Sequence, residues 1–418
     1  MRRAALPLLA FVLPLGVYLI GLRYVGSGDT EPAERLPIAL LHHGRLSFEA
    51  FVNPAEPLPY WYRSIKGRVV SNYPILPGLL NVPVFAAAEL VGVDLDARRQ
   101  ALSMITAATI SALSVVFLFL ALERICATRL RAFGFAMMYA FGTCVWSVTS
   151  RGMWQHGPSL LFLTISVWLI GKQDRRATAC VAFFLSLAVV TRPTNAVLVA
   201  PLVAFVLWSR PRDRVAFLAA GLVPLALESA YAWVYWRSPF SPAQANPIPE
   251  AANFGGNPFL GLAGLLVSPS RGLFVFSPVF LLALLVLPGV VRRRREDPIP
   301  FCLALGALAL LLVDSKWTMW WGGHSFGYRL LIETLPALTV LLAMTWENGT
   351  LRRPSLRAAM VVFAVWSVFV NFLGARFQPS GFNPEMQKDP GLLWSVRRGE
   401  IAMSVEKALS ELGIGQKS

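Results

Sequence analysis

Long runs of apolar residues recur along the whole chain and are separated by short polar segments. A helix that spans a bilayer needs about 20 predominantly apolar residues. The runs therefore predict an all-α polytopic membrane protein with about 11 transmembrane helices. The expected spans are 4–22, 101–123, 132–149, 158–170, 177–191, 195–208, 215–236, 272–291, 298–314, 329–346 and 357–375.

Basic residues between these runs alternate in a way that predicts the orientation. Lysine and arginine concentrate in the short cytoplasmic loops of membrane proteins. Every second segment, beginning with the N-terminal one, holds a basic cluster, whereas the short loops between them hold scattered single cations. The N-terminus is therefore predicted to be cytoplasmic. The clusters lie within 2–3, 124–131, 172–176, 210–214, 292–295 and 352–357.

The first outer loop, residues 23–100, contains an apolar stretch that is tempting to count as another span. This stretch, "YPILPGLLNVPVFAAAELVG" (73–92), is short and includes Pro77, Asn81, Pro83 and Glu89. If it crossed the membrane, every later basic cluster would lie outside. We therefore expect a helix that lies along the outer membrane surface.

A second juxtamembrane helix is expected at "TEPAERLPIALLHHG" (30–44). Asp29 or Thr30 is suited to cap its start, Pro32 falls in its first turn and Gly44 is suited to end it. The loop is thus predicted to contain two juxtamembrane helices joined by a proline-rich linker.

Composition agrees with this arrangement. The chain is 56% apolar with a mean hydropathy of +0.56, and only 15% of its residues are charged, less than in soluble domains. Cytoplasmic clusters that face an anionic leaflet explain the net charge of +15, so membrane lipids and not nucleic acid are the expected partners. The cysteines show neither metal-ligand nor disulfide spacing and are predicted to be packing residues: Cys126, Cys144, Cys180 and Cys302.

Polar and aromatic residues of unusual kinds gather at the outer ends of the predicted spans. Two acids, Asp29 and Glu31, follow the first span. The predicted orientation places cations, imidazoles and tryptophans of later loops on the same side and at a similar depth. They are Arg151, His156, Arg192, Arg271, Lys316, Trp320, Trp321, His324 and Arg329.

This set of side chains suits a lipid-linked sugar phosphate, whose tail stays in the bilayer while its head lies at the surface. Arginine and lysine bind phosphate, and arginine does so in a bidentate way. A carboxylate near the anomeric carbon can accept the proton of an attacking hydroxyl, and cations stabilise the charge on the leaving phosphate. Asp29, at the end of a span and the start of a capped helix, is at the depth this role needs.

Each of these residues also has a purely structural interpretation. Acids favour helix N-termini, tryptophans favour the membrane interface, and long cations reach toward headgroups. Arg329 is also one helical turn before Glu333, a spacing at which the two could pair. The two glycines after Trp320 and Trp321 favour a functional interpretation of that pair, because they allow close approach of backbone or ligand.

Several motifs occur in a characteristic order: "GDTEPAERLPIALLHHG", "YPILPGLL", "WQHGPSLLFL", "RPTNAVLVAPL", "SPSRGLFVFSP" and "WWGGHSFGYRLLIETLPAL". In these motifs the chain resembles the integral-membrane glycosyltransferases of the GT-C fold, which include protein mannosyltransferases and aminoarabinose transferases. The resemblance covers most of the chain. It implies a GT-C-like transmembrane domain over 1–375 and a short extracytoplasmic tail over 376–418, in which "EIAMSVEKALSELG" predicts an amphipathic helix.

The resemblance further implies an inverting transferase of the plasma membrane that moves a sugar from a polyprenyl-phosphate donor to an acceptor hydroxyl on the outer face. In that family the first-loop acid acts as, or beside, the catalytic base, which maps onto Asp29 with Glu31 next to it. Two departures stand out: Thr30 separates acids that are often adjacent, and "SRGMWQHGP" lacks an acid that many members carry. The second departure weakens the case for a bound metal, so no cofactor is predicted.

Two other functions remain open at this point. A transporter or flippase of lipid-linked saccharides would also need polar groups near the membrane, but transporters commonly show internal repeats and polar sites at the bilayer midplane. We find no repeat, and most of the unusual polar residues fall on one face. A non-catalytic scaffold would not need acids and cations from separate loops to converge. The enzyme is therefore the leading hypothesis and the transporter the alternative. The sequence does not identify the sugar or the acceptor, which could be a glycan, a lipid or a protein.

Overall fold

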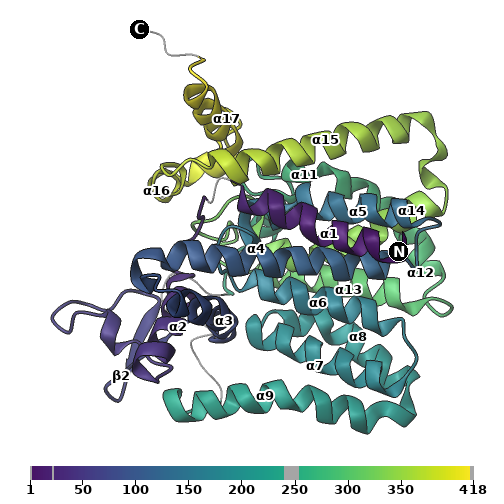
Figure 1. Ribbon diagram of the computed structural model, residues 1–418. Coiled ribbons are helices and arrows are strands. Elements are labelled where there is room, and N and C mark those ends of the chain that lie inside the picture. The colour runs from purple at the N-terminus through teal and green to yellow at the C-terminus, as the bar shows by residue number, and fades with distance from the viewer. Residues whose placement is uncertain (1, 21–22, 240–253, 415–418) are drawn as a thin grey trace.

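The structure is a computed structural model that describes residues 2–20, 23–239 and 254–414. Its main body is a bundle of helices that run in roughly the same direction, so that their ends form two opposite faces (Figure 1). The bundle helices are α1 (Arg2–Leu19), α4 (Leu95–Leu122), α5 (Arg129–Phe141), α6 (His156–Ile170), α7 (Arg175–Thr191), α8 (Asn195–Ser209), α9 (Arg214–Trp236), α13 (Pro298–Asp314), α14 (Leu335–Glu347) and α15 (Pro354–Phe377).

Each expected span coincides with a helix or with consecutive helices. The expected span 132–149 consists of α5 and a π-helical turn, and 272–291 is broken into three short helices because Pro278 and Pro288 interrupt it. In the part of the chain that the structure describes, four helical segments are long and apolar enough to cross a membrane: 95–122, 211–236, 329–347 and 354–377. The other bundle helices are apolar but shorter, so the total number of crossings stays a prediction.

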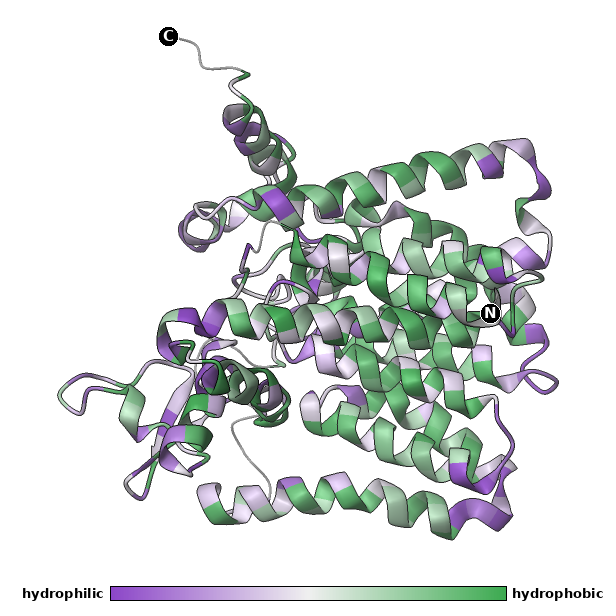
Figure 2. Ribbon diagram, viewed as in Figure 1, coloured by the Kyte–Doolittle hydropathy of each residue, from purple (hydrophilic) through white to green (hydrophobic). Residues whose placement is uncertain are grey.

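Apolar side chains cover the outward sides of the bundle. On α9 the exposed residues include Leu222, Leu227 and Trp233, and on α15 they include Val361 and Val365. Figure 2 shows these helices as largely hydrophobic along their length, with hydrophilic segments gathered near the two ends of the bundle. A hydrophobic wall between two polar ends is the pattern that a bilayer requires.

Two helices of the first outer loop lie at one end of the bundle and run across its direction (Figure 1). They are α2 (Glu31–His43) and α3 (Leu76–Leu90), and both expected helices are confirmed. Thr30 precedes α2 without a side-chain capping bond, and Gly44 ends it with a left-handed φ of 61°. Asn81 holds the pair together, because its Nδ2 donates to the Ala33 carbonyl at 2.8 Å and to the α4 residue Ser103 at 2.7 Å.

The sequence predicts a proline-rich linker between α2 and α3, whereas the structure contains a β-hairpin in this segment. Strands β1 (Tyr62–Ile65) and β2 (Arg68–Ser71) pair antiparallel. The two turn residues, Lys66 and Gly67, have φ values of 48° and 82°, as in the tight turns that match the twist of hairpin strands. We call the end of the bundle that carries this element the hairpin end.

The tail after α15 is folded against the hairpin end. It consists of α16 (Phe382–Lys388), a 3₁₀ segment η8 (Pro390–Trp394) and α17 (Glu400–Glu411). The expected amphipathic helix is therefore confirmed as α17. Between α9 and α13 lie the short helices α10 (Pro258–Val267), α11 (Leu273–Phe276), η5 (Pro278–Val286) and α12 (Leu287–Arg292).

Candidate functional site

Asp29 lies in the turn between α1 and α2, at the hairpin end. The turn sits closely under the hairpin, and a Cβ atom on Gly28 would clash with the Trp61 ring and the Tyr60 hydroxyl. Glycine is therefore needed at residue 28 for the chain to pass beneath these side chains. Inside the turn, the Asp29 amide donates to the Ser27 hydroxyl at 3.2 Å.

Three donors from separate parts of the chain surround the Asp29 carboxylate. The hydroxyls of Tyr73 and Tyr60 donate to Oδ1 at 2.7 and 2.9 Å, and Arg329 Nη1 donates to Oδ2 at 2.6 Å. Burial opposes ionisation of this carboxyl, but the charge of Arg329 and the hydrogen bonds from the two tyrosines outweigh it and hold the pKa of Asp29 below its ordinary value. The group is therefore ionised at neutral pH.

Arg329 reaches Asp29 from a loop that is 300 residues further along the chain. Gly322 and Gly323, in the same loop, have φ values of 74° and 67°, so the two positions favour glycine. The guanidinium also lies over the Trp154 ring, with its carbon 4.7 Å from the ring centroid. Its Nε is buried and has no hydrogen-bond partner. Arg329 thus keeps at least this donor for a further acceptor.

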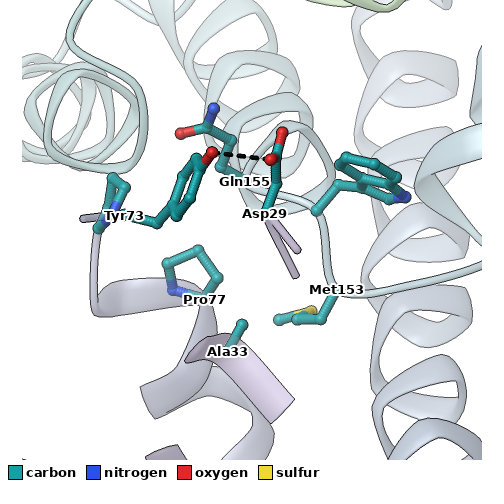
Figure 3. Close-up of a pocket in the computed structure, with 8 residues that line it drawn as sticks. Asp29, Ala33, Tyr73, Pro77, Met153 and Gln155 are labelled. Atoms are coloured by element: carbon teal, nitrogen blue, oxygen red, sulfur yellow. Dashed lines mark hydrogen bonds between the residues drawn. The ribbon is translucent and has the colours of Figure 1, made fainter. Parts of the chain in front are cut away.

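A pocket opens beside the carboxylate (Figure 3). In the close-up, Tyr73 and Gln155 flank Asp29, and Pro77, Ala33 and Met153 form the opposite wall. The pocket therefore has one polar wall and one apolar wall, as a ligand with a polar head and an apolar tail requires. Its full lining is Asp29, Ala33, Tyr73, Pro74, Pro77, Met153, Trp154 and Gln155.

The other acids of the motif have partners of their own, separate from those of Asp29. Glu31 pairs with Arg35 at 2.9 Å and approaches Arg99 at 3.6 Å. Glu34 is fully buried and accepts a hydrogen bond from Tyr24. Its second oxygen has no hydrogen-bond partner but lies 3.9 Å from Arg99 Nε. Burial raises the pKa of Glu34 to about 7, against which the Tyr24 hydrogen bond acts only partly. Glu31 thus belongs to a salt-bridge pair beside the site.

Two of the predicted site residues, His156 and Arg192, belong to an internal ionic network. His156 Nδ1 lies 2.8 Å from a Glu333 oxygen, and Arg192 pairs with Glu333 and, at 3.4 Å, with Asp314. The alternative pairing of Arg329 with Glu333, which their spacing allowed, is not formed, because Arg329 pairs with Asp29 and Glu333 pairs with Arg192. The network ties the ends of α6, α7, α13 and η6 (Arg329–Thr334) together, and it satisfies charges that would be costly alone at this depth.

Arg151 and Arg271 are also buried among protein groups. Arg151 donates to the Tyr18 carbonyl at 3.1 Å. Arg271 donates to Trp321, Ser270, Asn383 and Glu400. These internal contacts give both arginines a structural role, and donor binding by either one stays a prediction.

The remaining predicted residues lie in the loop before Arg329. Lys316 is exposed. Trp320 is buried, and its ring packs edge-on against Trp321 with centroids 5.9 Å apart. The exposed His324 lies 2.7 Å from Gln387, and partial burial lowers its pKa although Asp29 acts in the opposite direction. The charge of Asp29 thus acts on the pKa of His324, although no hydrogen bond joins the two side chains.

Sequence reasoning missed Tyr60 and Tyr73, which hold Asp29 directly. The signal was the aromatic content of "PYWYR" and "SNYPILPG" on either side of the hairpin. The pairing of these two segments needs the hairpin, which the sequence analysis did not predict. Within the described residues, no cluster of three or more histidines, cysteines or acids is arranged to hold a metal ion.

Comparisons with known proteins bear on the fold. No family model matches the chain, and no curated protein matches it either. Among solved structures, the chain is similar to ArnT from Cupriavidus metallidurans, whose crystal structure contains undecaprenyl phosphate. The TM-score is 0.51 at 14% sequence identity, over 97% of this chain and 75% of that chain. The resemblance to GT-C aminoarabinose transferases is thus confirmed as a likeness of fold, and the chain is an integral membrane protein.

Proposed function

We propose that this protein is an inverting membrane glycosyltransferase that takes a sugar from a polyprenyl-phosphate donor and transfers it to an acceptor hydroxyl. The observation that carries the proposal is the ion pair of Arg329 with Asp29, an acid that lines a pocket with one polar and one apolar wall. An ionised acid and an arginine at headgroup depth supply the two charges that this reaction needs. The likeness in fold to ArnT, which binds undecaprenyl phosphate in its crystal structure, supports the class of donor.

In this proposal Asp29 is the base. A carboxylate offers about four lone-pair directions, and Tyr60, Tyr73 and Arg329 occupy three of them. The acceptor hydroxyl donates to the fourth. As its oxygen attacks the anomeric carbon, the proton passes to Asp29, the bond from that carbon to the phosphate oxygen breaks, and the configuration inverts.

Arg329 is the phosphate-binding group in the same reaction. The lipid phosphate leaves with a growing negative charge, and a fixed cation stabilises it as it forms. The unpartnered Nε of Arg329 is the donor available to the phosphate, while Nη1 keeps Asp29 in place. The stack on Trp154 fixes the plane of the guanidinium, and Trp321 is a candidate surface for the sugar face.

The orientation follows from the distribution of charge. The loops that hold the basic clusters lie at the end of the bundle opposite the hairpin (Figure 1), which supports a cytoplasmic N-terminus and a site on the outer face. A plasma-membrane enzyme of this orientation would meet acceptors of the cell envelope. Membrane lipids surround its apolar walls.

The decisive variant is Asp29→Asn, which keeps the shape of the side chain and removes its charge. The purified protein is incubated with a panel of polyprenyl-phosphate sugars and a cell-envelope extract as acceptor source, and release of lipid phosphate is measured. We expect Asp29→Asn to lower the rate by at least about 100-fold, with membrane insertion unchanged. Asp96→Asn, an exposed acid of the same outer loop, is the matched control and keeps full activity.

Full activity of Asp29→Asn would remove the assigned base. The same protein in liposomes that contain a labelled lipid-linked sugar separates the enzyme from a transporter. Movement of intact donor between the leaflets, without release of lipid phosphate, would establish the transporter instead.

A further inference from the structure

The C-terminal segment, residues 378–412, packs against the loop that leads into Arg329. This loop, residues 317–328, begins after α13 and contains three tryptophans and three glycines. Helices α16 and α17 lie near the hairpin end in Figure 1. The segment is thus placed where it can act on the site, although none of its residues lines the pocket.

The strongest link is a buried ion pair between Glu400, the first residue of α17, and Arg271. The two side chains are 0% and 1% exposed. The Glu400 oxygen that receives Arg271 also accepts the amide of Gly327 at 3.0 Å. Gly327 has a left-handed φ of 63°, and its carbonyl accepts the amide of Arg329 at 3.0 Å. Glu400 therefore holds the backbone two residues before Arg329.

Arg271 extends this link to both partners. Its Nε donates to the carbonyl of Trp321, in the loop, at 3.0 Å. Its Nη2 donates to Asn383, in α16, at 2.8 Å. One buried guanidinium thus connects the loop, at Trp321 just before Gly322 and Gly323, with the C-terminal segment, at Asn383 and Glu400.

Two further contacts fix the middle of the loop. The side chain of Gln387 in α16 lies 2.7 Å from His324. Trp320 is buried in an apolar cluster that the C-terminal segment supplies, made up of Phe382, Met386, Leu392 and Leu393. Trp320, Trp321, His324 and Gly327 thus each have a partner in the C-terminal segment or in Arg271.

A loop with three left-handed glycines has little conformational preference of its own, because glycine adopts many backbone conformations. Its shape must therefore come from its partners. Burying an ion pair is costly in desolvation, and such a pair is weak evidence for stability alone. Simple attachment of the tail would be served by the apolar cluster, so the ion pair and its bond to Gly327 call for another explanation.

We propose that the C-terminal segment is a positioning element for Arg329, with Glu400 as the positioning residue. The segment sets the conformation of loop 317–328 and so aims the guanidinium at Asp29. Its effect on sugar transfer rests on the proposed function, whereas its effect on the loop does not.

Hydrogen exchange of the full-length protein in detergent tests the effect on the loop. Glu400→Gln keeps the size of the side chain but leaves the buried charge of Arg271 without an opposite charge beside it. We expect exchange in peptides covering 317–328 to rise by about tenfold or more, while peptides of α4 and α6 are unchanged. Glu406→Gln, an exposed acid of the same helix, is the matched control and leaves exchange in the loop as it is.

The transfer assay tests the consequence for the site. In Glu400→Gln we expect kcat/KM for the polyprenyl-phosphate donor to fall by about tenfold, mainly through a higher KM, because Arg329 is the proposed phosphate-binding group. Asp29→Asn, by contrast, loses transfer without faster exchange in 317–328. If the wild-type protein shows no transfer, the proposed function fails while the exchange data still decide the role of the segment.

An outcome in which exchange rises only within 378–412, with loop and donor KM unchanged, would show that the segment is merely attached. If Glu400→Gln does not fold, the pair Arg271→Met with Glu400→Leu replaces it. That double variant leaves no unpaired charge but still lacks the bond to Gly327, so faster exchange in 317–328 is expected again and its absence overturns the proposal.

Discussion

At the scale of single residues, the charge state of Asp29 follows from its three donors. Each of them stabilises the ionised carboxylate, so each lowers the pKa of Asp29 against the effect of burial. Ordinary aspartate is already ionised at neutral pH. The donors therefore fix the orientation of the carboxylate and extend the pH range in which Asp29 is ionised toward acid pH.

Removing the shortest tyrosine bond shows this effect. Tyr73→Phe keeps the ring and loses the donor that lies 2.7 Å from Oδ1. The ionised form loses support, so the pKa of Asp29 rises and the acid limb of the pH–rate profile moves to higher pH. We expect kcat/KM at neutral pH to fall by about three- to tenfold, through looser positioning of the base. The measurement is the pH dependence of lipid-phosphate release.

The hairpin supplies a matched control for this variant. Tyr62 is a buried tyrosine whose hydroxyl has no hydrogen-bond partner. Tyr62→Phe therefore removes the same atom without removing a bond, and both the rate and the acid limb are expected to stay in place. An equal shift of the acid limb in the two variants would refute the assignment of Tyr73.

Glu34 gives a second prediction at this scale, this time for stability. Its pKa is raised from 4.5 to about 7 by burial, so the folded protein holds a proton that the unfolded chain releases at lower pH. The free energy of unfolding therefore decreases as pH rises from about 4.5 to about 7. Glu34→Gln does not titrate and so avoids this loss. As pH rises from 5 to 8, the melting temperature of the variant is therefore expected to increase relative to that of the wild type.

Thermal melts in detergent at several pH values measure this difference. Glu56→Gln, an exposed acid of the same loop, is expected to follow the wild-type profile throughout. A constant difference between Glu34→Gln and wild type over this range would mean that Glu34 does not change protonation there.

At the scale of elements, hydropathy predicted the bundle helices and α3 well, because apolar run length is a direct requirement of the bilayer. Helix α2 was predicted from its first-turn proline and its terminal glycine. The hairpin escaped prediction because its strands have four residues each and its turn uses Lys66 before Gly67 in place of the usual asparagine or aspartate. The contacts of Asp29 with Tyr60 and Tyr73 depend on that hairpin. They were out of reach for the same reason.

The turn of the hairpin is a point at which this dependence can be tested. Gly67 has a φ of 82° and open space around a Cβ atom, so Gly67→Ala introduces backbone strain of about 1 kcal/mol without a clash. We expect faster hydrogen exchange in 60–73 and a severalfold loss of kcat/KM. Lys66→Asn is the control, because asparagine tolerates a left-handed conformation. Unchanged exchange in Gly67→Ala would mean that contacts outside the turn determine the hairpin.

At the scale of the whole molecule, the charge pattern and the fold agree on one feature. The acids after the first span and the loop "WWGGHSFGYR" meet at the same end of the bundle, as the alternating basic clusters required. The individual pair of Asp29 with Arg329 could not be derived in this way. Orientation rules place segments on a side of the membrane, whereas partners 300 residues apart depend on how the bundle packs.

This agreement makes sidedness the most informative global property to measure. The four cysteines are unpaired, and only Cys180 is exposed, so Cys180→Ser provides a background with little labelling. In it, Glu56→Cys and Lys316→Cys mark the hairpin end, and Arg294→Cys marks the opposite end. We expect a membrane-impermeant maleimide to label the first two in intact spheroplasts and the third only after permeabilisation. Because donor and acceptor must both reach Asp29, labelling of Arg294→Cys from outside, with the other two protected, would place the reaction in the cytoplasm and overturn the proposed acceptors.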